Sequence, residues 1–116
     1  MQTVALDFDG PIHRYREGWK DGSIYDFPVM GVEDALKKLL EKHPVFILSS
    51  RDSHQIAEWM KEKFPSIPVE VIDDKTKFWT ASGVIGITNR KLAATVYVDD
   101  RALKFFNWSQ VLREVK

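Results

Sequence analysis

The feature that most constrains this chain is a short apolar run, rich in β-forming residues, that recurs four times and each time ends in polar or acidic residues. The four runs are residues 3–6, 45–48, 68–72 and 95–98. Continuous apolar runs of this length are typical of strands that are buried on both faces of a parallel sheet. We therefore predict four strands within one sheet.

Helical patterns separate these runs. Apolar residues recur at helical spacing over 32–42 and 53–64, and a third helical segment closes the chain over 108–115. Asp52 and Ser53 are both candidates for the N-cap of the second helix. Alternating strands and helices predict an α/β fold, a three-layer sandwich with a parallel central sheet and helices on its faces.

The size of the chain predicts a single domain over residues 1–116. The chain has 116 residues, of which 44% are hydrophobic and 29% charged, which is the profile of one globular core. Residues 12–30, called the flap below, form an irregular loop in this prediction. Residues 73–90 show no clear pattern, and residues 103–106 are a candidate for a short further strand.

Charge and composition exclude several classes of protein. Seventeen basic and seventeen acidic residues cancel, so bulk charge indicates neither a nucleic-acid nor a membrane-surface partner. The chain has no cysteine, which excludes disulfides and thiolate metal sites. No run approaches the ~20 apolar residues of a membrane span, and the N-terminus does not resemble a signal peptide. We therefore expect a cytoplasmic protein with no membrane partner.

Acidic pairs follow three of the predicted strands, and the pair after the third, Asp73 and Asp74, lacks a continuation that could begin a helix. Asp7 and Asp9 follow the first run, and Asp99 and Asp100 follow the last. Ligands of such sheets bind at the carboxyl ends of the strands, so these carboxylates are expected to meet there. Clustered carboxylates repel one another unless a cation compensates, and an all-oxygen ligand set favours Mg²⁺. For Asp7 and Asp9 alone, strand ending and helix capping remain an alternative.

The motifs, taken in order, resemble those of the haloacid dehalogenase superfamily of phosphohydrolases. They are D-F-D-G-P at 7–11, I-L-S-S-R at 47–51, a basic residue, and Y-V-D-D-R at 97–101. The S-x-R and D-D-R forms are most similar to the phosphatase domain of phage polynucleotide kinase. The resemblance implies a Rossmann-like core. Residues 12–30 and 73–90 are too short for the cap domain of larger relatives, so we expect an open site that admits bulky substrates, such as nucleic-acid ends, phosphoproteins or phosphorylated sugars.

The resemblance also implies roles for individual residues. Asp7 is expected to be the nucleophile that forms an aspartyl-phosphate, and Asp9 the general acid and then the base. Ser49 is expected to bind the phosphoryl group through its hydroxyl and its backbone N–H. The Mg²⁺ ligands are expected to be Asp7, the Asp9 backbone carbonyl and Asp100, with Asp99 beside Asp100.

The superfamily also places a lysine between its second and last motifs. Lys91 is the preferred candidate because it lies shortly before the last predicted strand, and Lys75 and Lys77 compete for the role. This lysine is expected to neutralise the nucleophile and the phosphoryl oxygens. For each of the three, a solvated surface charge is the alternative.

Three further residues are candidates for binding the substrate phosphate: Gly10, Ser50 and Arg51. Spacing to Arg51 favours Ser49 over Ser50 as the motif serine. Arg51 either contacts the substrate phosphate or pairs with a carboxylate, and the sequence leaves both open.

Several polar and aromatic flap residues have two interpretations. Arg14 and Arg16 either meet a substrate phosphate or are exposed on the surface. His13 follows the nucleophile loop closely and is either structural or in contact with substrate. Trp19 and Tyr25 either shape the substrate entrance or form a local mini-core.

Two other classes of function remain as alternatives to a Mg²⁺-dependent phosphomonoester phosphatase. A phosphoryl-accepting receiver domain shares the size, the sheet and the acidic site. A receiver, however, has its acidic pair after the first strand and its phosphorylated Asp after the third, whereas here D-x-D-G comes first and D-D last. The other alternative is a non-catalytic binding module of the same fold, against which the complete motif set argues.

Overall fold

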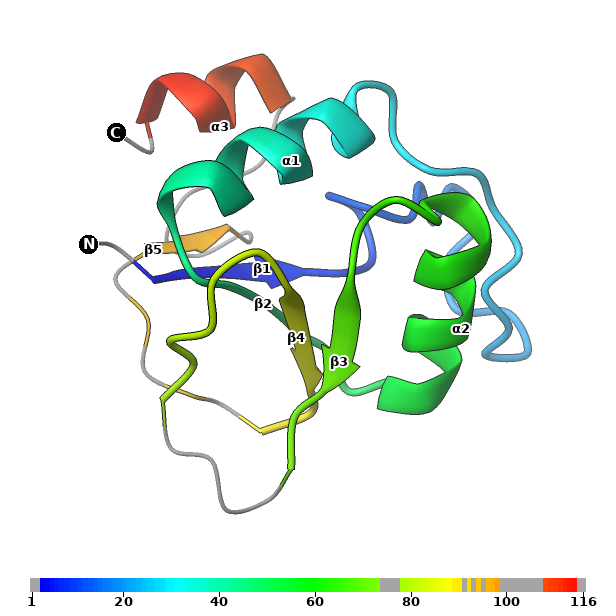
Figure 1. The fold of residues 1–116 in the computed structure, drawn as a ribbon. Helices are drawn as coiled ribbons and strands as arrows, with labels where there is room; N and C mark the ends of the chain where they lie inside the picture. The colour runs from blue at the N-terminus through cyan, green and yellow to red at the C-terminus, as the bar shows by residue number, and fades with distance from the viewer. Residues whose placement is uncertain are drawn as a thin grey trace.

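The predicted α/β class with a parallel sheet is confirmed by a computed structural model, which describes residues 3–73, 78–90, 92, 94, 96–98 and 108–114. Figure 1 shows the arrangement of the strands and helices. In chain order they are β1 (Val4–Asp7), α1 (Val32–Lys42), β2 (Val45–Leu48), α2 (Ser53–Lys63), β3 (Val69–Val71), β4 (Ile85–Thr88), β5 (Val96–Val98) and α3 (Trp108–Glu114).

The five strands form one sheet in the order β3-β4-β2-β1-β5, and every pair is parallel. The strand β1 lies between β2 and β5 (Figure 1). Asp7 pairs with Leu48, and Leu6 pairs with Val98. The strands β1, β2 and β5 therefore end at the same edge of the sheet, which is the edge where the sequence predicts the site.

The two faces of the sheet are covered differently. Alternate residues such as Leu6 and Ile47 point to one face, where they join the buried residues of α1, α2 and α3 in a single core. Their neighbours point to the other face, where Phe46 packs with Ile72 and Trp79. In the described residues, that second layer has no helix.

The direction of each connection explains this division. From β1 to β2 and from β2 to β3 the chain moves one way along the sheet, and from β3 to β4 and from β4 to β5 it moves back. Parallel connections of one hand place forward and backward crossings on opposite faces. The helical crossings therefore share one face, and the segments around Ile72, Trp79 and Leu92 cover the other.

The three predicted helices are confirmed. Of the two candidate caps for α2, Asp52 is the N-cap, because its carboxylate accepts the backbone N–H of His54 at 2.8 Å. The strand predicted at 103–106 lies outside the described residues. No helix within the described ranges is long and apolar enough to span a bilayer.

The strand β4 was not predicted. It lies inside 73–90, where the sequence shows no clear pattern, and it contains Gly86. A Cβ at Gly86 would lie 2.6 Å from Cδ1 of Ile72 and 2.8 Å from Cε2 of Trp79. The glycine is therefore required by close packing from the second face, a constraint that comes from residues distant in space and leaves no local pattern.

The flap is irregular, as predicted, but backbone hydrogen bonds join its two ends. Ile12 is fully buried, and its carbonyl accepts the N–H of Val29 at 2.8 Å. The N–H of Arg14 donates to the carbonyl of Phe27 at 3.0 Å. These bonds bring the two ends of the flap together beside the end of β1.

Candidate active site

Asp7 and Ser49 lie at the same edge of the sheet, because Asp7 pairs with Leu48 and Ser49 comes next in the chain. The Asp7 carboxylate is half-buried, and its Oδ1 accepts the backbone N–H of Phe8 at 2.8 Å. This bond holds the carboxylate near the strand end.

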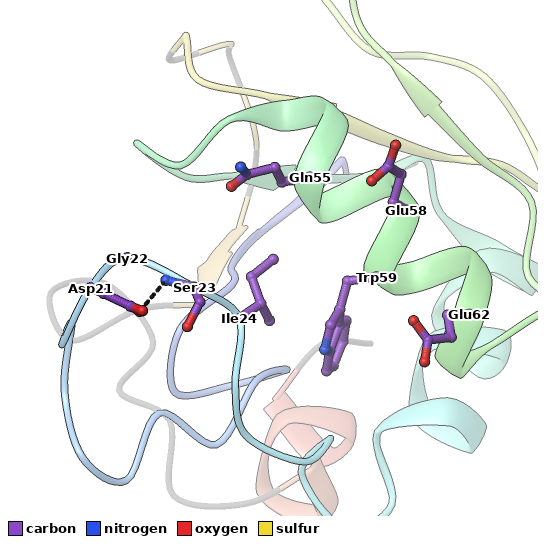
Figure 2. A pocket seen from close by; sticks show the side chains of 8 residues that line it. All are labelled: Asp21, Gly22, Ser23, Ile24, Gln55, Glu58, Trp59 and Glu62. Carbon is purple, nitrogen blue, oxygen red and sulfur yellow. Dashed lines mark hydrogen bonds between the residues drawn. The ribbon is translucent and has the colours of Figure 1, made fainter.

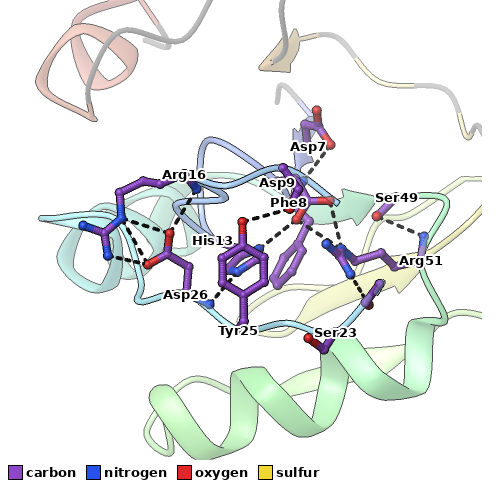
Figure 3. A network of polar contacts seen from close by, with 12 residues as sticks. Asp7, Phe8, Asp9, His13, Arg16, Ser23, Tyr25, Asp26, Ser49 and Arg51 are labelled. Atoms are coloured by element: carbon purple, nitrogen blue, oxygen red, sulfur yellow. Dashed lines mark hydrogen bonds and ion pairs between the residues drawn. The ribbon is translucent and has the colours of Figure 1, made fainter. Parts of the chain in front are cut away.

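Asp9 lies inside a hydrogen-bonded network that Figure 3 shows. The Nε–H of Arg51 donates to Oδ1 at 3.1 Å and to Oδ2 at 2.9 Å. The Nδ1 of His13 lies 2.8 Å from Oδ1. The Asp9 side chain keeps 19% of its surface exposed, so it is anchored but still reachable.

His13 is fully buried, and both of its ring nitrogens have a partner. The backbone N–H of Asp26 donates to Nε2 at 2.9 Å, so this nitrogen must be the acceptor. The ring proton therefore sits on Nδ1 and points to Asp9. A neutral imidazole with this tautomer satisfies both contacts.

Arg51 pairs with a carboxylate, which is one of the two roles that the sequence left open. Its side chain is buried, and its Nη1 donates to the carbonyl of Gly22 at 2.6 Å. The guanidinium lies 4.5 Å from the ring centre of Trp19 and 5.7 Å from that of Tyr15. Within the described residues, its buried Nη2 has no hydrogen-bond partner.

Ser49 is placed as predicted, but only part of its predicted contact is possible. Its backbone N–H donates to the carbonyl of Thr88 at 3.1 Å, so the expected phosphoryl contact through this amide is wrong. The reason is that β4, which was not predicted, takes the amide into the sheet. The Ser49 hydroxyl accepts the N–H of Arg51 at 3.2 Å and still has its own proton to donate.

The two other residues predicted to contact a phosphate, Gly10 and Ser50, lie in different surroundings. The Gly10 amide donates to the carbonyl of His13 at 2.7 Å, and Gly10 has a φ of 102°, so this glycine serves the turn after β1. Its amide is therefore not available to a phosphate. Ser50 is exposed and lines a cavity of about 380 Å³ with Arg51 and Thr88 at the ends of β2 and β4.

The remaining predicted site residues lie outside the described residues. They are Asp99, Asp100, Lys91, Lys75 and Lys77. Among the described residues, no three histidine, aspartate or glutamate side chains come together as a metal-holding group. Two residues of the predicted metal set, Asp7 and Asp9, lie within the described residues.

A flap ion pair between Asp26 and Arg16 was missed at the sequence level. The buried Asp26 carboxylate accepts the Arg16 Nη2 at 2.7 Å, its Nε at 3.0 Å and its backbone N–H at 3.0 Å. The hydrogen bonds from Arg16 hold the pKa of Asp26 well below its usual range, and the same pair raises the pKa of Arg16. The two residues lie ten positions apart in an irregular loop, so no periodicity points to their contact.

The other flap residues now have defined places. Tyr25 belongs to the local structure, because its hydroxyl donates to the carbonyl of Gly18 at 2.8 Å. Trp19 keeps half of its surface exposed and covers Arg51. Arg14 donates from Nε to the carbonyl of Pro28 at 3.3 Å.

A groove of about 440 Å³ lies between the flap and α2 (Figure 2). It is lined by the carboxylates of Asp21, Glu58 and Glu62 together with the Trp59 ring. No described basic side chain lines it. This groove is therefore unsuited to a phosphate, and the candidate phosphate site lies across the flap, at the Asp7 end of the network.

Comparisons with known proteins support the fold class alone. No protein-family model and no curated protein matches the chain. A solved structure described as a conserved protein coded by a locus from Bacteroides thetaiotaomicron is similar, with a TM-score of 0.59 and 22% sequence identity. The match covers 99% of this chain and 92% of that one. At this identity, the likeness is one of fold.

Proposed function

We propose that this protein is a Mg²⁺-dependent phosphomonoester phosphatase of the haloacid dehalogenase type, which acts through an aspartyl-phosphate on Asp7. The observation that carries the proposal is the contrast between two carboxylates two residues apart. Asp7 ends β1 and accepts the backbone N–H of Phe8, while Asp9 is held by Arg51 and His13. Two carboxylates in different environments are what a nucleophile and an acid/base group require.

In the first step, an oxygen of Asp7 attacks phosphorus and the bond from phosphorus to the ester oxygen breaks. Asp9 gives its proton to that leaving oxygen. The Ser49 hydroxyl donates to a phosphoryl oxygen from beside Asp7, which its place at the end of β2 supports. Lys91 is proposed as the cation that offsets the charge.

In the second step, Asp9 removes a proton from water, which attacks the phosphorus of the aspartyl-phosphate. The bond to Asp7 breaks, and inorganic phosphate leaves. The pairing of Asp9 with Arg51 at 2.9 Å holds its carboxylate in place for this base role.

The proposed cofactor fits the kind of donors present. Asp7 offers carboxylate oxygens, and Asp100 and the Asp9 carbonyl complete the proposed oxygen set that Mg²⁺ prefers, with Asp99 beside Asp100. When bound, Mg²⁺ supplies positive charge against the phosphoryl oxygens.

For the substrate, we propose a phosphomonoester on a bulky group: a nucleic-acid end, a phosphoprotein or a phosphorylated sugar. No cap domain covers the site in the described residues, and Asp9 stays partly exposed. The carboxylate-lined groove beside the flap disfavours a long polyanion on that side.

The test is phosphate release from a panel of phosphomonoesters, with Mg²⁺ and with a chelator. The panel includes a 3′-phosphorylated oligonucleotide, a phosphopeptide, a sugar phosphate and an aryl phosphate. We expect Mg²⁺-dependent release by the wild-type chain and none by Asp7→Asn, with similar thermal unfolding of the two proteins. Equal activity in both proteins would contradict the covalent mechanism. A stable phosphoaspartate without turnover would instead favour a receiver.

A second variant tests the role of Asp9. We expect Asp9→Asn to lower the rate on alkyl phosphates by about 10²–10⁴-fold. An aryl phosphate needs less help from an acid, so phosphoenzyme should accumulate and be trapped. Equal losses on both substrates, with no trapped intermediate, would remove Asp9 from acid/base chemistry.

A further inference from the structure

His13 connects the flap to the acid/base carboxylate through one ring. Its Nδ1–H donates to Asp9 at 2.8 Å, and its Nε2 accepts the backbone N–H of Asp26 at 2.9 Å. We propose that His13 is a positioning residue that holds Asp9 in place through both halves of the reaction. This inference rests on the proposed function.

The ring of His13 is fixed in orientation by an aromatic enclosure. Phe8 stacks on it at 5.6 Å between ring centres, and the rings of Tyr25 and Trp59 meet it edge-on at 5.3 and 5.9 Å. The side chain has no exposed surface. The ring therefore has no room to swing, and its N–H stays aimed at Asp9.

The two donors to Asp9 differ in what they favour. Arg51 is a cation, so its bonds favour only the ionised carboxylate. His13 is a neutral donor, and its bond to Oδ1 is compatible with a carboxylate and with a carboxylic acid protonated on Oδ2. Arg51 contacts both Asp9 oxygens, whereas His13 contacts Oδ1 alone, so the His13 bond fixes one oxygen and leaves Oδ2 for proton transfer.

The flap selects the tautomer that this role needs. The Asp26 N–H requires a lone pair on Nε2, which leaves the proton on Nδ1. With the other tautomer, a nitrogen lone pair would face the Asp9 oxygen and an N–H would face the Asp26 N–H. The flap contact to Nε2 of His13 therefore also fixes the Nδ1–H that positions Asp9.

Two amide substitutions separate the two contacts. In His13→Asn, the side-chain NH₂ lies near the former Nδ1 and keeps the donor to Asp9. In His13→Gln, the side-chain carbonyl reaches the former Nε2 position and keeps the acceptor for Asp26. Steady-state kinetics on an alkyl and an aryl phosphate, with Mg²⁺ present, compare both variants with the wild type.

We expect His13→Gln to lower kcat on the alkyl phosphate by about 10–100-fold, with KM little changed, as for a group misplaced by up to about 1 Å. We expect a smaller loss on the aryl phosphate and a kcat within about 5-fold of wild type for His13→Asn. Equal losses in the two variants, or equal losses on the two substrates, would overturn the positioning role while the phosphatase activity stands.

A measurement on the wild-type chain covers the case in which both variants fail to fold. Nitrogen-15 spectra of the His13 ring should show the proton on Nδ1 and a bare Nε2, and the reverse tautomer would overturn the inference. A folded wild-type chain that releases no phosphate with Mg²⁺ overturns the proposed function, and the inference falls with it.

Discussion

The ends of β2 and β4 contain the same turn, made from the same kinds of residue. After β2, the N–H of Arg51 donates to the hydroxyl of Ser49 at 3.2 Å. At the end of β4, the N–H of Arg90 donates to the hydroxyl of Thr88 at 3.0 Å. Both hydroxyl residues are buried, and the Ser49 amide joins the two turns through the carbonyl of Thr88.

The two arginines nevertheless have different surroundings. Arg51 is 2% exposed and pairs with Asp9, whereas Arg90 is an exposed residue. The strand β2 is the neighbour of β1, and β4 lies one strand further away. The comparison teaches that the local turn alone does not decide the surroundings of its arginine: the order of the strands decides which arginine meets the Asp9 carboxylate.

The largest expected effect comes from removing each arginine in turn. Arg51→Met should destabilise the protein by about 3 kcal/mol, at the low end for a broken buried ion pair because Asp9 keeps some exposure. Arg90→Met, the matched control, should cost less than about 1 kcal/mol. Urea unfolding measures both, and equal costs would remove the distinction between the two strand ends.

Removing the hydroxyl of Ser49 or of Thr88 should destabilise the protein less, and only one of the two substitutions should also change activity. Ser49→Ala and Thr88→Val each leave a backbone N–H without its acceptor and should cost about 1–3 kcal/mol of stability. Only Ser49→Ala should also lower kcat, by about 10²-fold, because only Ser49 lies beside Asp7. A similar loss of kcat in Thr88→Val would extend the site to β4.

Substitutions in the flap, which covers the turn after β2, are expected to have the smallest effect on stability at neutral pH. The pKa of Asp26 is lowered by Arg16, so the pair stabilises the fold above the usual carboxyl pKa of about 4 and this stabilisation is lost as the pH falls further. Asp26→Asn should therefore lower the urea midpoint at pH 7, and its difference from wild type should narrow below about pH 4. Because Arg16 is largely exposed, solvent screens the pair.

If the ion pair is the source of the stabilisation, Arg16→Gln should lower the urea midpoint at pH 7 by the same amount as Asp26→Asn. A difference between Asp26→Asn and wild type that stays constant from pH 7 to pH 3 would assign the stabilisation to the hydrogen bonds of Asp26 alone.

The sequence predicts the elements whose signals are local. The helix over 32–42 was predicted because its buried residues, such as Leu36 and Leu39, recur at helical spacing. Asp52 could be recognised as a cap because its partner, His54, is two residues away. The places of Asp7 and Ser49 followed from the parallel arrangement of the strands they end.

Only the tertiary structure decided the contacts between residues that are far apart in the chain. Arg51 lies 42 residues from Asp9, and Gly86 in β4 lets Ile72 and Trp79 approach the sheet closely. A strand with a glycine at its centre has little propensity of its own, and a buried ion pair leaves no periodic trace in the sequence. The sequence by itself determined the strands β1, β2, β3 and β5, the helices and the motif order, because these depend on neighbours within a few residues. The partners of Asp9 depend on strand order and flap closure, which only the packed fold determines.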